Sequence, residues 1–407
     1  MRQIMKTKTS YLFPIFLLIV IFSEEIFYGF MALTGISVES GMKSRMAIAI
    51  AAVGYLMLLS DIVNARLNAR NAKQFVALLL VLVLYVITGV LYGGGNAKHT
   101  SYLLVYGSYC VPAAYVGMRL ARERNLTGIN KLLPFFVIPL TLIIGSNMGG
   151  YMAESVLVRE DASGLNYQSV SYFMSFFFSY SAYYCFFSNV DHKGFWKRLL
   201  YFAMLANMFA SALFCLFGGG RGAFVYIVFI TLYLIWSLFS SNKGHRGYIV
   251  LIIAIISVVF LYLFMKLDVL DSAGMTRITE QLTADDEREE LWGKAMDAFK
   301  ESPIIGHGLG SIWWTVGFYS HNIVADLMAE TGIIGTGIVF YVLLLIFSRL
   351  YKMYRLDKSI LFVILVYLGT LVEVTFSGYW IAAHQLFFAY GFVFALNRKD
   401  RMLIKFN

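Results

Sequence analysis

Residues 223–240 read AFVYIVFITLYLIWSLFS, eighteen consecutive residues without a charged side chain. A stretch of this length and hydrophobicity crosses the hydrocarbon core of a bilayer as a helix, because a helix satisfies its backbone hydrogen bonds internally. The chain of 407 residues is 59% hydrophobic and 14% charged. We therefore predict an all-α polytopic membrane protein, one membrane domain over residues 1–407 with about 12 transmembrane helices. The predicted spans are 11–34, 46–64, 74–94, 102–118, 132–147, 169–188, 199–217, 223–240, 247–265, 321–348, 359–377 and 380–397.

Lysine and arginine residues indicate which side of the membrane each loop faces. When the N-terminus is placed in the cytoplasm, the cytoplasmic segments hold 23 of the 33 lysine and arginine residues. This distribution satisfies the positive-inside rule, and a shift by one span would invert half of the loops. We predict that both termini are cytoplasmic. The net charge of +9 then follows from topology and gives no reason to expect nucleic acid as a partner.

The one large loop, residues 266–320, lies between the ninth and tenth spans and is predicted to be extracytoplasmic. Within it, residues 287–300 read EREELWGKAMDAFK, the pattern of an amphipathic helix. Four apolar residues share one face of this helix: Leu291, Trp292, Ala295 and Phe299. Arg288 falls on the same face, where a guanidinium group costs several kcal/mol unless it meets an anion. Arg288 therefore either meets an anion or packs its aliphatic stem on the apolar face and extends its guanidinium group into water.

The turn between the seventh and eighth spans reads GGGRG at residues 218–222. Glycines leave room for backbone N–H groups to approach a ligand, and Arg221 adds a positive charge. Two arginines on different elements, Arg221 and Arg288, suit the binding of a diphosphate, because each guanidinium can hold a phosphate in a bidentate manner. The alternative is a flexible turn with an arginine at the membrane interface.

The tenth span begins at His321, in the sequence YSHN. The helix dipole keeps a histidine at this position neutral, and a neutral imidazole is able to act as a general base. Polar residues then recur every four positions along one face of the helix: Asn322, Asp326 and Glu330. Buried carboxylates there indicate a cavity or a polar partner on another span. We also predict that three glycines allow close packing of this helix: Gly332, Gly335 and Gly337.

Cysteine and glycine patterns exclude other classes of site. Cys110, Cys185 and Cys215 all fall in predicted spans, and no His/Cys cluster has the spacing of a zinc site. We predict no metal and no cofactor. The sequence GHGLG at residues 306–310 follows no strand, so it is not a dinucleotide-binding loop. We expect it to shape the turn between the amphipathic helix and the tenth span.

These residues, in their order along the chain, resemble the O-antigen ligase and O-antigen polymerase superfamily of bacterial membrane glycosyltransferases. The resemblance covers about residues 215–340, with a further likeness of NYQxxS at residues 166–171. The matching motifs are GGRGA at 219–223, ERxxLW at 287–292, SPxxGxGxG at 302–310, HN at 321–322 and ExGxxG at 330–335.

In that family, a glycan carried on a lipid diphosphate is transferred to an acceptor hydroxyl. The resemblance implies that Arg221 and Arg288 neutralise the leaving diphosphate and that His321 is the base, or positioner, of the acceptor. We also predict four substrate-binding residues: Gly220, Asn322, Glu330 and Gln168. The expected substrate is an undecaprenyl-diphosphate-linked repeat unit of an O-antigen or capsule, transferred with inversion and without a metal ion. The expected location is the bacterial cytoplasmic (inner) membrane, with a chain-length regulator and a flippase as partners.

Three alternatives remain open at this point. We favour a polymerase, which passes the glycan to another lipid-linked repeat unit, over a ligase, which passes it to lipid A core. A polysaccharide-lipid transporter would also have many spans with intramembrane acids, but it is expected to show two related halves with broken helices, and no such internal repeat is found. A scaffold without catalysis would leave Arg288 unexplained.

Overall fold

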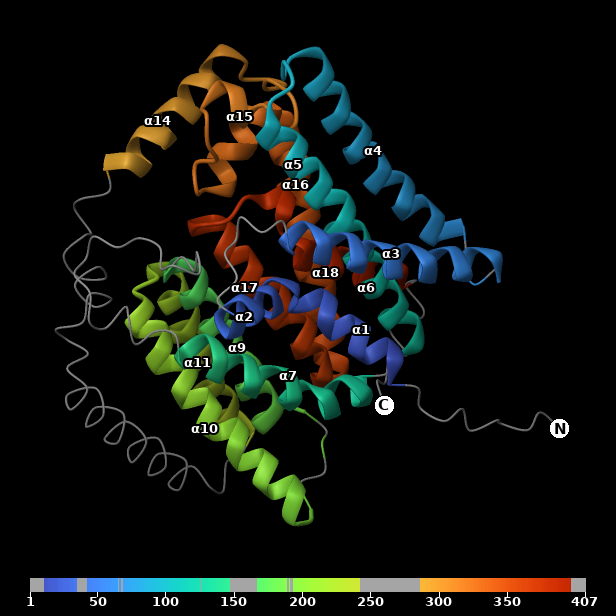
Figure 1. Ribbon diagram of the computed structural model, residues 1–407, viewed down its shortest axis with the longest axis vertical. Coiled ribbons are helices and arrows are strands. Elements are labelled where there is room, and N and C mark those ends of the chain that lie inside the picture. The colour runs from blue at the N-terminus through green and yellow to red at the C-terminus, as the bar shows by residue number, and fades with distance from the viewer. Residues whose placement is uncertain are drawn as a thin grey trace.

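The structure is a computed structural model that describes residues 11–34, 42–64, 66, 69–124, 126–146, 167–188, 190, 193–241 and 286–396. The described residues form helices and no strand. Figure 1 shows them as a helical bundle, with α14, α15 and the α4–α5 turn together at one end. The longer helices are α1 (Leu12–Ile21), α2 (Ser23–Thr34), α3 (Met42–Val63), α4 (Ala69–Leu91), α5 (Ala97–Val105), α6 (Val111–Glu123), α7 (Leu126–Ser146), α9 (Tyr167–Phe186), α10 (Phe195–Gly218), α11 (Arg221–Ser241), α14 (Asp286–Glu301), α16 (Ile323–Leu356), α17 (Leu361–Phe376) and α18 (His384–Ala395). The short elements are the π-helical η2 (Tyr106–Cys110), α15 (Ile312–Thr315), η5 (Lys358–Ile360) and η6 (Trp380–Ala382).

The predicted class, a helical protein with several membrane spans, is confirmed. Seven of the described helices are long and apolar enough to cross a membrane, or eight if α1 and α2 form one span. The ninth predicted span, residues 247–265, lies outside the described residues, as does the first part of the 266–320 loop. The total of about 12 spans and the extent of this loop therefore stay predictions.

The first predicted span is broken where the sequence changes from apolar to SEE. α1 and α2 are bent by 79° at Phe22. The bend leaves the carbonyl oxygen of Ile21 without a helical partner, and Gln385 Nε2 of α18 donates to it at 3.2 Å. A buried carbonyl needs such a partner, so α18 stabilises the break.

Helix α9 lies at the centre of one half of the bundle and contacts α7, α10, α11 and α17. Its buried surface is rich in serine, which lets neighbouring helices approach closely. Serine hydroxyls are satisfied within the helix, because Ser175 Oγ donates to the Tyr172 carbonyl and Ser179 Oγ to the Phe176 carbonyl, both at 2.8 Å. The many tyrosines and serines of α9 lower its hydropathy, yet the helix is buried. Its N-terminal turns reach the predicted site.

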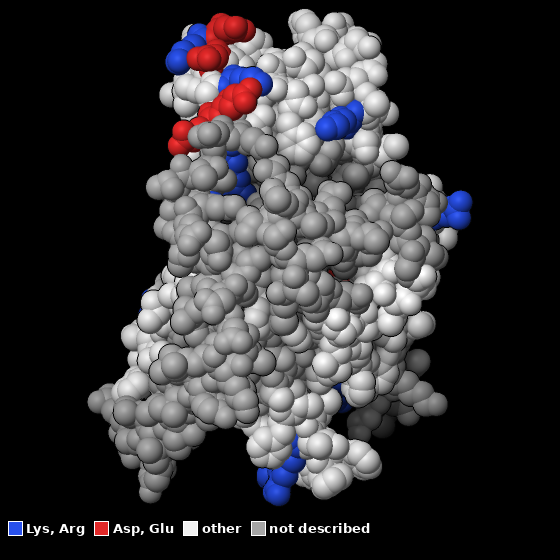
Figure 2. Space-filling model, turned by 60° about the vertical axis from the view of Figure 1, so that its left-hand side comes forward, with Lys and Arg blue, Asp and Glu red and all other residues white. Residues whose placement is uncertain are grey.

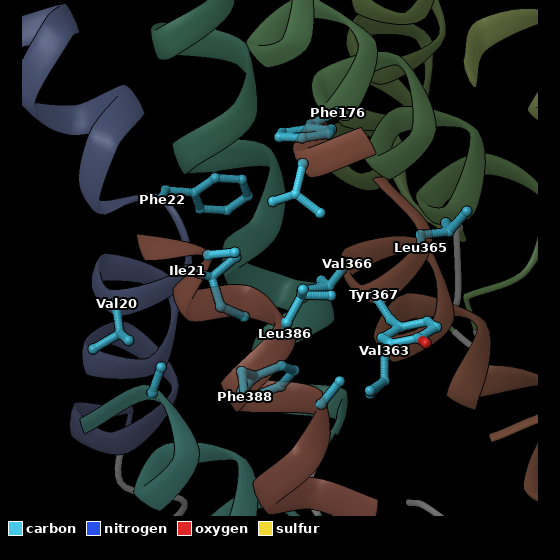
Figure 3. Packing of buried hydrophobic residues seen from close by; sticks show 14 of the residues in the cluster. Val20, Ile21, Phe22, Phe176, Val363, Leu365, Val366, Tyr367, Leu386 and Phe388 are labelled. Carbon is cyan, nitrogen blue, oxygen red and sulfur yellow. The ribbon is translucent and has the colours of Figure 1, made fainter. Parts of the chain in front are cut away.

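Helices α6 and α18 cross closely. A Cβ atom at Gly391 would lie 1.9 Å from the carbonyl oxygen of Ala114, and one at Gly117 would lie 2.1 Å from that of Phe388. Only glycine fits at both positions. The crossing adjoins the apolar core, from which Figure 3 shows Ile21 and Phe22 together with Leu386 and Phe388 of α18 and Val366 of α17.

Replacing Gly391 with alanine is expected to destabilise the protein by about 1–3 kcal/mol, because the helices must separate to accept even one methyl group. Thermal unfolding of the detergent-solubilised protein measures the effect. Gly337→Ala is the matched control, since a Cβ there has nothing within 4 Å and alanine favours a helix. A Gly391→Ala protein as stable as the Gly337→Ala protein would contradict this packing.

The contacts between loops agree with the predicted alternation of sides. Segments predicted to be outside contact one another: Asn96 Nδ2 donates to the Trp313 carbonyl at 3.2 Å, and His321 bonds to Ser377. Segments predicted to be inside do the same, since Arg122 bonds to the carbonyl of Arg66. In Figure 2, Asp and Glu side chains gather with Lys and Arg at the end that carries α14, and the described surface elsewhere in this view shows mainly separate Lys and Arg patches, including one at the opposite end.

Candidate active site

Helix α14 packs on α16 and α15. Arg288 therefore lies next to the protein surface that α14 covers. Ala295 and Ala298 are buried, and Arg288 and Leu291 are half-buried on the same face. The spacing predicted this face, with one correction: the Trp292 side chain is 43% exposed. Its Nε1 donates to the Ser320 carbonyl at 2.8 Å, so Trp292 acts as a hydrogen-bond donor at the edge of the packed face.

The glycine-rich loop after α14 closes a break in α16. Gly332 has φ 60° and ψ −167°, which interrupts the helix expected over 321–348. The break frees backbone groups on both sides, and the loop supplies their partners. Four hydrogen bonds result, with the N–H donor named first: His307 to Ala329 (3.1 Å), Gly308 to Glu330 (2.7 Å), Ile333 to Pro303 (2.9 Å) and Ile334 to Ile304 (3.3 Å).

Glycine is needed where this loop and α16 touch. A Cβ at Gly306 would lie 2.4 Å from the carbonyl of Glu330, and one at Gly332 would lie 2.4 Å from that of Ile304. The glycine-rich loop therefore shapes the approach to α16, as expected. Among the residues that the structure describes, no helix packs closely on Gly337, where a Cβ would meet nothing within 4 Å, or on Gly335, where a Cβ would face Thr331 of its own helix.

His321 has an unusual backbone conformation. Its φ is 58°, and among the described residues only Arg124 is another non-glycine residue with positive φ. Such a conformation persists only where the surroundings determine it, and it is concentrated at functional sites. The backbone of the residue before it is held at both of its polar groups: Asp326 Oδ1 accepts from Ser320 N–H at 2.7 Å, and the Ser320 carbonyl accepts from Trp292.

The residue after His321 begins the helix. Asn322 Oδ1 accepts from the N–H groups of Val324 (2.9 Å) and Ala325 (3.4 Å), the geometry of a helix N-cap. Capping accounts for asparagine at this position. The predicted substrate contact of Asn322 stays a proposal.

The imidazole of His321 is oriented by the turn after α17. Its Nδ1 lies 2.7 Å from the carbonyl oxygen of Ser377. Because a carbonyl only accepts, Nδ1 carries the hydrogen, and the basic lone pair of the neutral ring is on Nε2. Ser377 Oγ in turn donates to Gln168 Oε1 at 2.9 Å. Gln168 is thus connected to His321 through Ser377, a residue that no local pattern singled out.

The glycine turn before α11 packs against α9. Gly219 ends α10 with φ 70°, and the Gly220 N–H donates to Ser171 Oγ at 3.0 Å. A Cβ at Gly220 would lie 2.5 Å from Ser171 Cβ. This contact, rather than a ligand, accounts for the Gly220 amide in the structure. Arg221 follows as the first residue of α11 and is half-buried.

Tyr172 connects the two arginine-bearing elements. A Cβ at Gly222 would lie 2.1 Å from the Tyr172 hydroxyl oxygen, so α11 starts directly against this tyrosine. The hydroxyl is also within electrostatic range of the Arg288 guanidinium and the Glu373 carboxyl group. Tyr172 lies one helical turn after Gln168, and this spacing is the signal that could have identified it.

The first turns of α9 are connected indirectly to each of the three predicted catalytic residues. Gln168 leads to His321, Ser171 holds the turn before Arg221, and Tyr172 lies near Arg288. Such an arrangement can present a half-buried guanidinium and an oriented imidazole to one anionic substrate.

Glu330 is different: it is fully buried, and Tyr379 and Trp380 donate to its carboxylate.

Acidic groups also surround this region. The ring of Tyr319 is within electrostatic range of Asp326, Glu373 and Glu24, and burial raises the pKa of the Tyr319 hydroxyl. Glu24 lies in α2 and Glu373 in α17. Among the residues that the structure describes, no group of three or more His, Cys, Asp or Glu side chains is arranged to hold a metal ion.

The fold defines a helical protein with several helices long and apolar enough to cross a membrane, with α14 and α15 at one end of the bundle. A family model described as O-antigen ligase matches residues 206–340, from within α10 into α16. This match supports membership of the O-antigen ligase and polymerase superfamily, a family that implies a membrane enzyme of the glycosyltransferase type. The matched range contains the glycine turn, α14, the glycine-rich loop and His321. A search of curated proteins finds no match.

Proposed function

We propose that this protein polymerises undecaprenyl-diphosphate-linked oligosaccharide repeat units of an O-antigen or capsule at the outer face of the bacterial inner membrane. The observation that carries the proposal is the strained His321, held by Ser377 and connected through Gln168 to the helix that adjoins both arginine-bearing elements. The family match supports the substrate class. We propose that both termini are cytoplasmic, and that a chain-length regulator and a flippase are partners.

In the proposed reaction, the acceptor hydroxyl oxygen attacks the anomeric carbon of the donor glycan. The bond from that carbon to the phosphate oxygen breaks, and the lipid diphosphate leaves with the electron pair. Arg221 and Arg288 neutralise the charge that develops on it, and His321 Nε2 takes the proton of the hydroxyl. One displacement of this kind inverts the anomeric carbon. Gly220, Asn322, Glu330 and Gln168 were the residues predicted to contact substrate. Of these, Gln168 has the contacts that best fit such a role.

A transporter is the second candidate, because α1–α2 and α16 are broken helices, a feature of many transporters. In a transporter the freed backbone groups bind ions or substrate. Here the groups freed at both breaks bond to protein, namely to α18 and to the loop after α14. This difference and the family match favour the enzyme.

Purified protein incubated with lipid-linked repeat units alone is expected to produce a ladder of glycans, measured by gel electrophoresis. EDTA should leave the ladder unchanged, since guanidinium groups supply the positive charge. Product that forms only after lipid A core is added would identify a ligase instead. Loss of the ladder in EDTA, with recovery on adding a divalent cation, would contradict the metal-independent mechanism. Movement of lipid-linked units across vesicles without any transfer would identify a transporter.

A further inference from the structure

The Glu330 carboxylate ties α16 to a turn about fifty residues later in the chain. One oxygen accepts from the Tyr379 hydroxyl, and the other accepts from Trp380 Nε1 at 3.2 Å. Both oxygens of a carboxylate accept hydrogen bonds, so they suit these two donors. A glutamine in this position would turn its NH₂ group, itself a donor, towards one of them. Glu330 is 0% exposed. Its side chain is occupied by protein, which does not favour a direct contact with substrate.

The turn that Glu330 holds also orients His321. This turn, residues 377–380, connects α17 to η6. At its start, the N–H groups of Ser377 and Gly378 donate to the Glu373 carbonyl at 2.7 and 2.9 Å. At its end, Glu330 accepts from Tyr379 and Trp380. Between these two attachments, the Ser377 carbonyl accepts from His321 Nδ1.

Aromatic packing gives a second connection between Glu330 and His321. The ring of Tyr379 stacks on Tyr319, with centroids 5.9 Å apart and planes 23° apart. Tyr319 packs edge to face against the His321 ring, with centroids 4.5 Å apart. Any shift of Tyr379 would therefore move both the carbonyl that His321 binds and the ring that packs against its face.

The backbone of Glu330 is itself fixed. Its carbonyl accepts from Gly308 N–H at 2.7 Å, and it lies two residues before the break at Gly332. The glycine-rich loop thus sets the position of α16 at Glu330, and the Glu330 carboxylate sets the position of the 377–380 turn. This explains why an acidic side chain is retained in a buried position, where a carboxyl group is costly without partners.

We propose that Glu330 and Tyr379 are positioning residues for His321. The hydrogen bond between them holds the Ser377 carbonyl against Nδ1, which fixes the tautomer that leaves Nε2 as the base. The inference rests on the proposed glycosyl transfer and assigns Glu330 a role that differs from substrate binding. An outer partner of a functional histidine commonly contributes 10- to 100-fold to its site.

Tyr379→Phe tests the inference, because it removes the hydroxyl and retains the stacked ring. We expect kcat for transfer to fall about 10-fold while the KM for the lipid-linked donor stays within about twofold, since the arginines still bind the diphosphate. Nitrogen NMR of protein labelled with ¹⁵N-histidine reports the tautomer. The His321 signal, assigned by its loss in His321→Asn, should change from one tautomer in the natural protein to a mixture in the variant.

Tyr183→Phe is the matched control. It also removes a buried hydroxyl, which donates to Asn130 Oδ1 at 3.1 Å. Tyr183, however, lies near the opposite end of α9 from Gln168. This variant should retain kcat and the His321 tautomer.

Glu330→Gln retains one acceptor for the Tyr379 hydroxyl. Its kcat should therefore lie between that of the natural protein and that of Glu330→Ala.

Two results would overturn the inference. An unchanged kcat in Tyr379→Phe would show that the bond does not support catalysis. A lower kcat with an unchanged His321 tautomer would show that Tyr379 acts on stability alone. Failure of the natural protein to transfer glycans from a lipid diphosphate would instead contradict the proposed function. The two failures are therefore distinguished within one set of assays.

Discussion

Arg288→Lys is expected to lower glycan transfer about 100-fold although the charge is kept. Arg288 is half-buried on the packed face of α14, within electrostatic range of the Tyr172 hydroxyl. At such a place a guanidinium can hold two phosphate oxygens at once in a fixed plane, whereas an ammonium binds as a point charge. The loss should appear mainly in kcat, because the negative charge on the bridging oxygen is largest as the diphosphate leaves. Steady-state rates with purified lipid-linked donor measure it.

The control for Arg288→Lys lies on the same helix. Lys294 is on the exposed face and pairs with Glu290 at 2.6 Å. Lys294→Ala therefore removes a cation from α14 away from the packed face, and we expect transfer within about twofold of the natural protein, as for most exposed ion pairs. Both variants should elute as folded protein in detergent. Near-normal transfer by Arg288→Lys would contradict the diphosphate role of this arginine.

The sequence predicted the helical spans better than their shape. Uninterrupted apolar runs identify helices because a bilayer permits few other structures. The break at Phe22 coincides with the polar SEE sequence, but the break at Gly332 could not be predicted from a single glycine. It depends on backbone partners supplied by residues 303–308, which are joined to α16 only through folding. The low hydropathy of α9 likewise gave no sign that it would be a buried central helix.

Local sequence patterns gave the positions of Arg288 and His321. They did not give the residues that contact His321 and Glu330. Spacing placed Arg288 on the packed face of α14, and the position of His321 before a helix was also correct. A glycine pattern cannot distinguish a backbone that approaches a ligand from one that approaches another helix, which is why Gly220 was assigned to substrate and packs on Ser171. Ser377 and Tyr379 meet His321 and Glu330 across about fifty residues of chain, and no local pattern contains such contacts.

His321→Asn is expected to lower transfer by about 100- to 10,000-fold, the range that general acid–base catalysis contributes. Asparagine is the informative replacement because His321 has φ 58°, and asparagine adopts this left-handed conformation more readily than most residues. The variant should therefore fold with the Ser320 peptide and the Asn322 cap in place. Transfer by the natural protein should rise with pH as the imidazolium loses its proton and then level off, because the arginines stay charged throughout.

His307→Ala is the control, since His307 lies in the glycine-rich loop that precedes His321 in the chain and its Nε2 is 2.8 Å from the Ala298 carbonyl. We expect this variant to lose stability rather than catalysis. The kinetic constants of His321→Asn then decide between the two roles of the imidazole. If it accepts the proton, kcat falls and the rise with pH disappears. If it only positions the acceptor, the KM for the acceptor rises while kcat and its pH dependence persist. The second result would require another base, and Glu373 and Glu24, both within electrostatic range of Tyr319, are the groups to replace next.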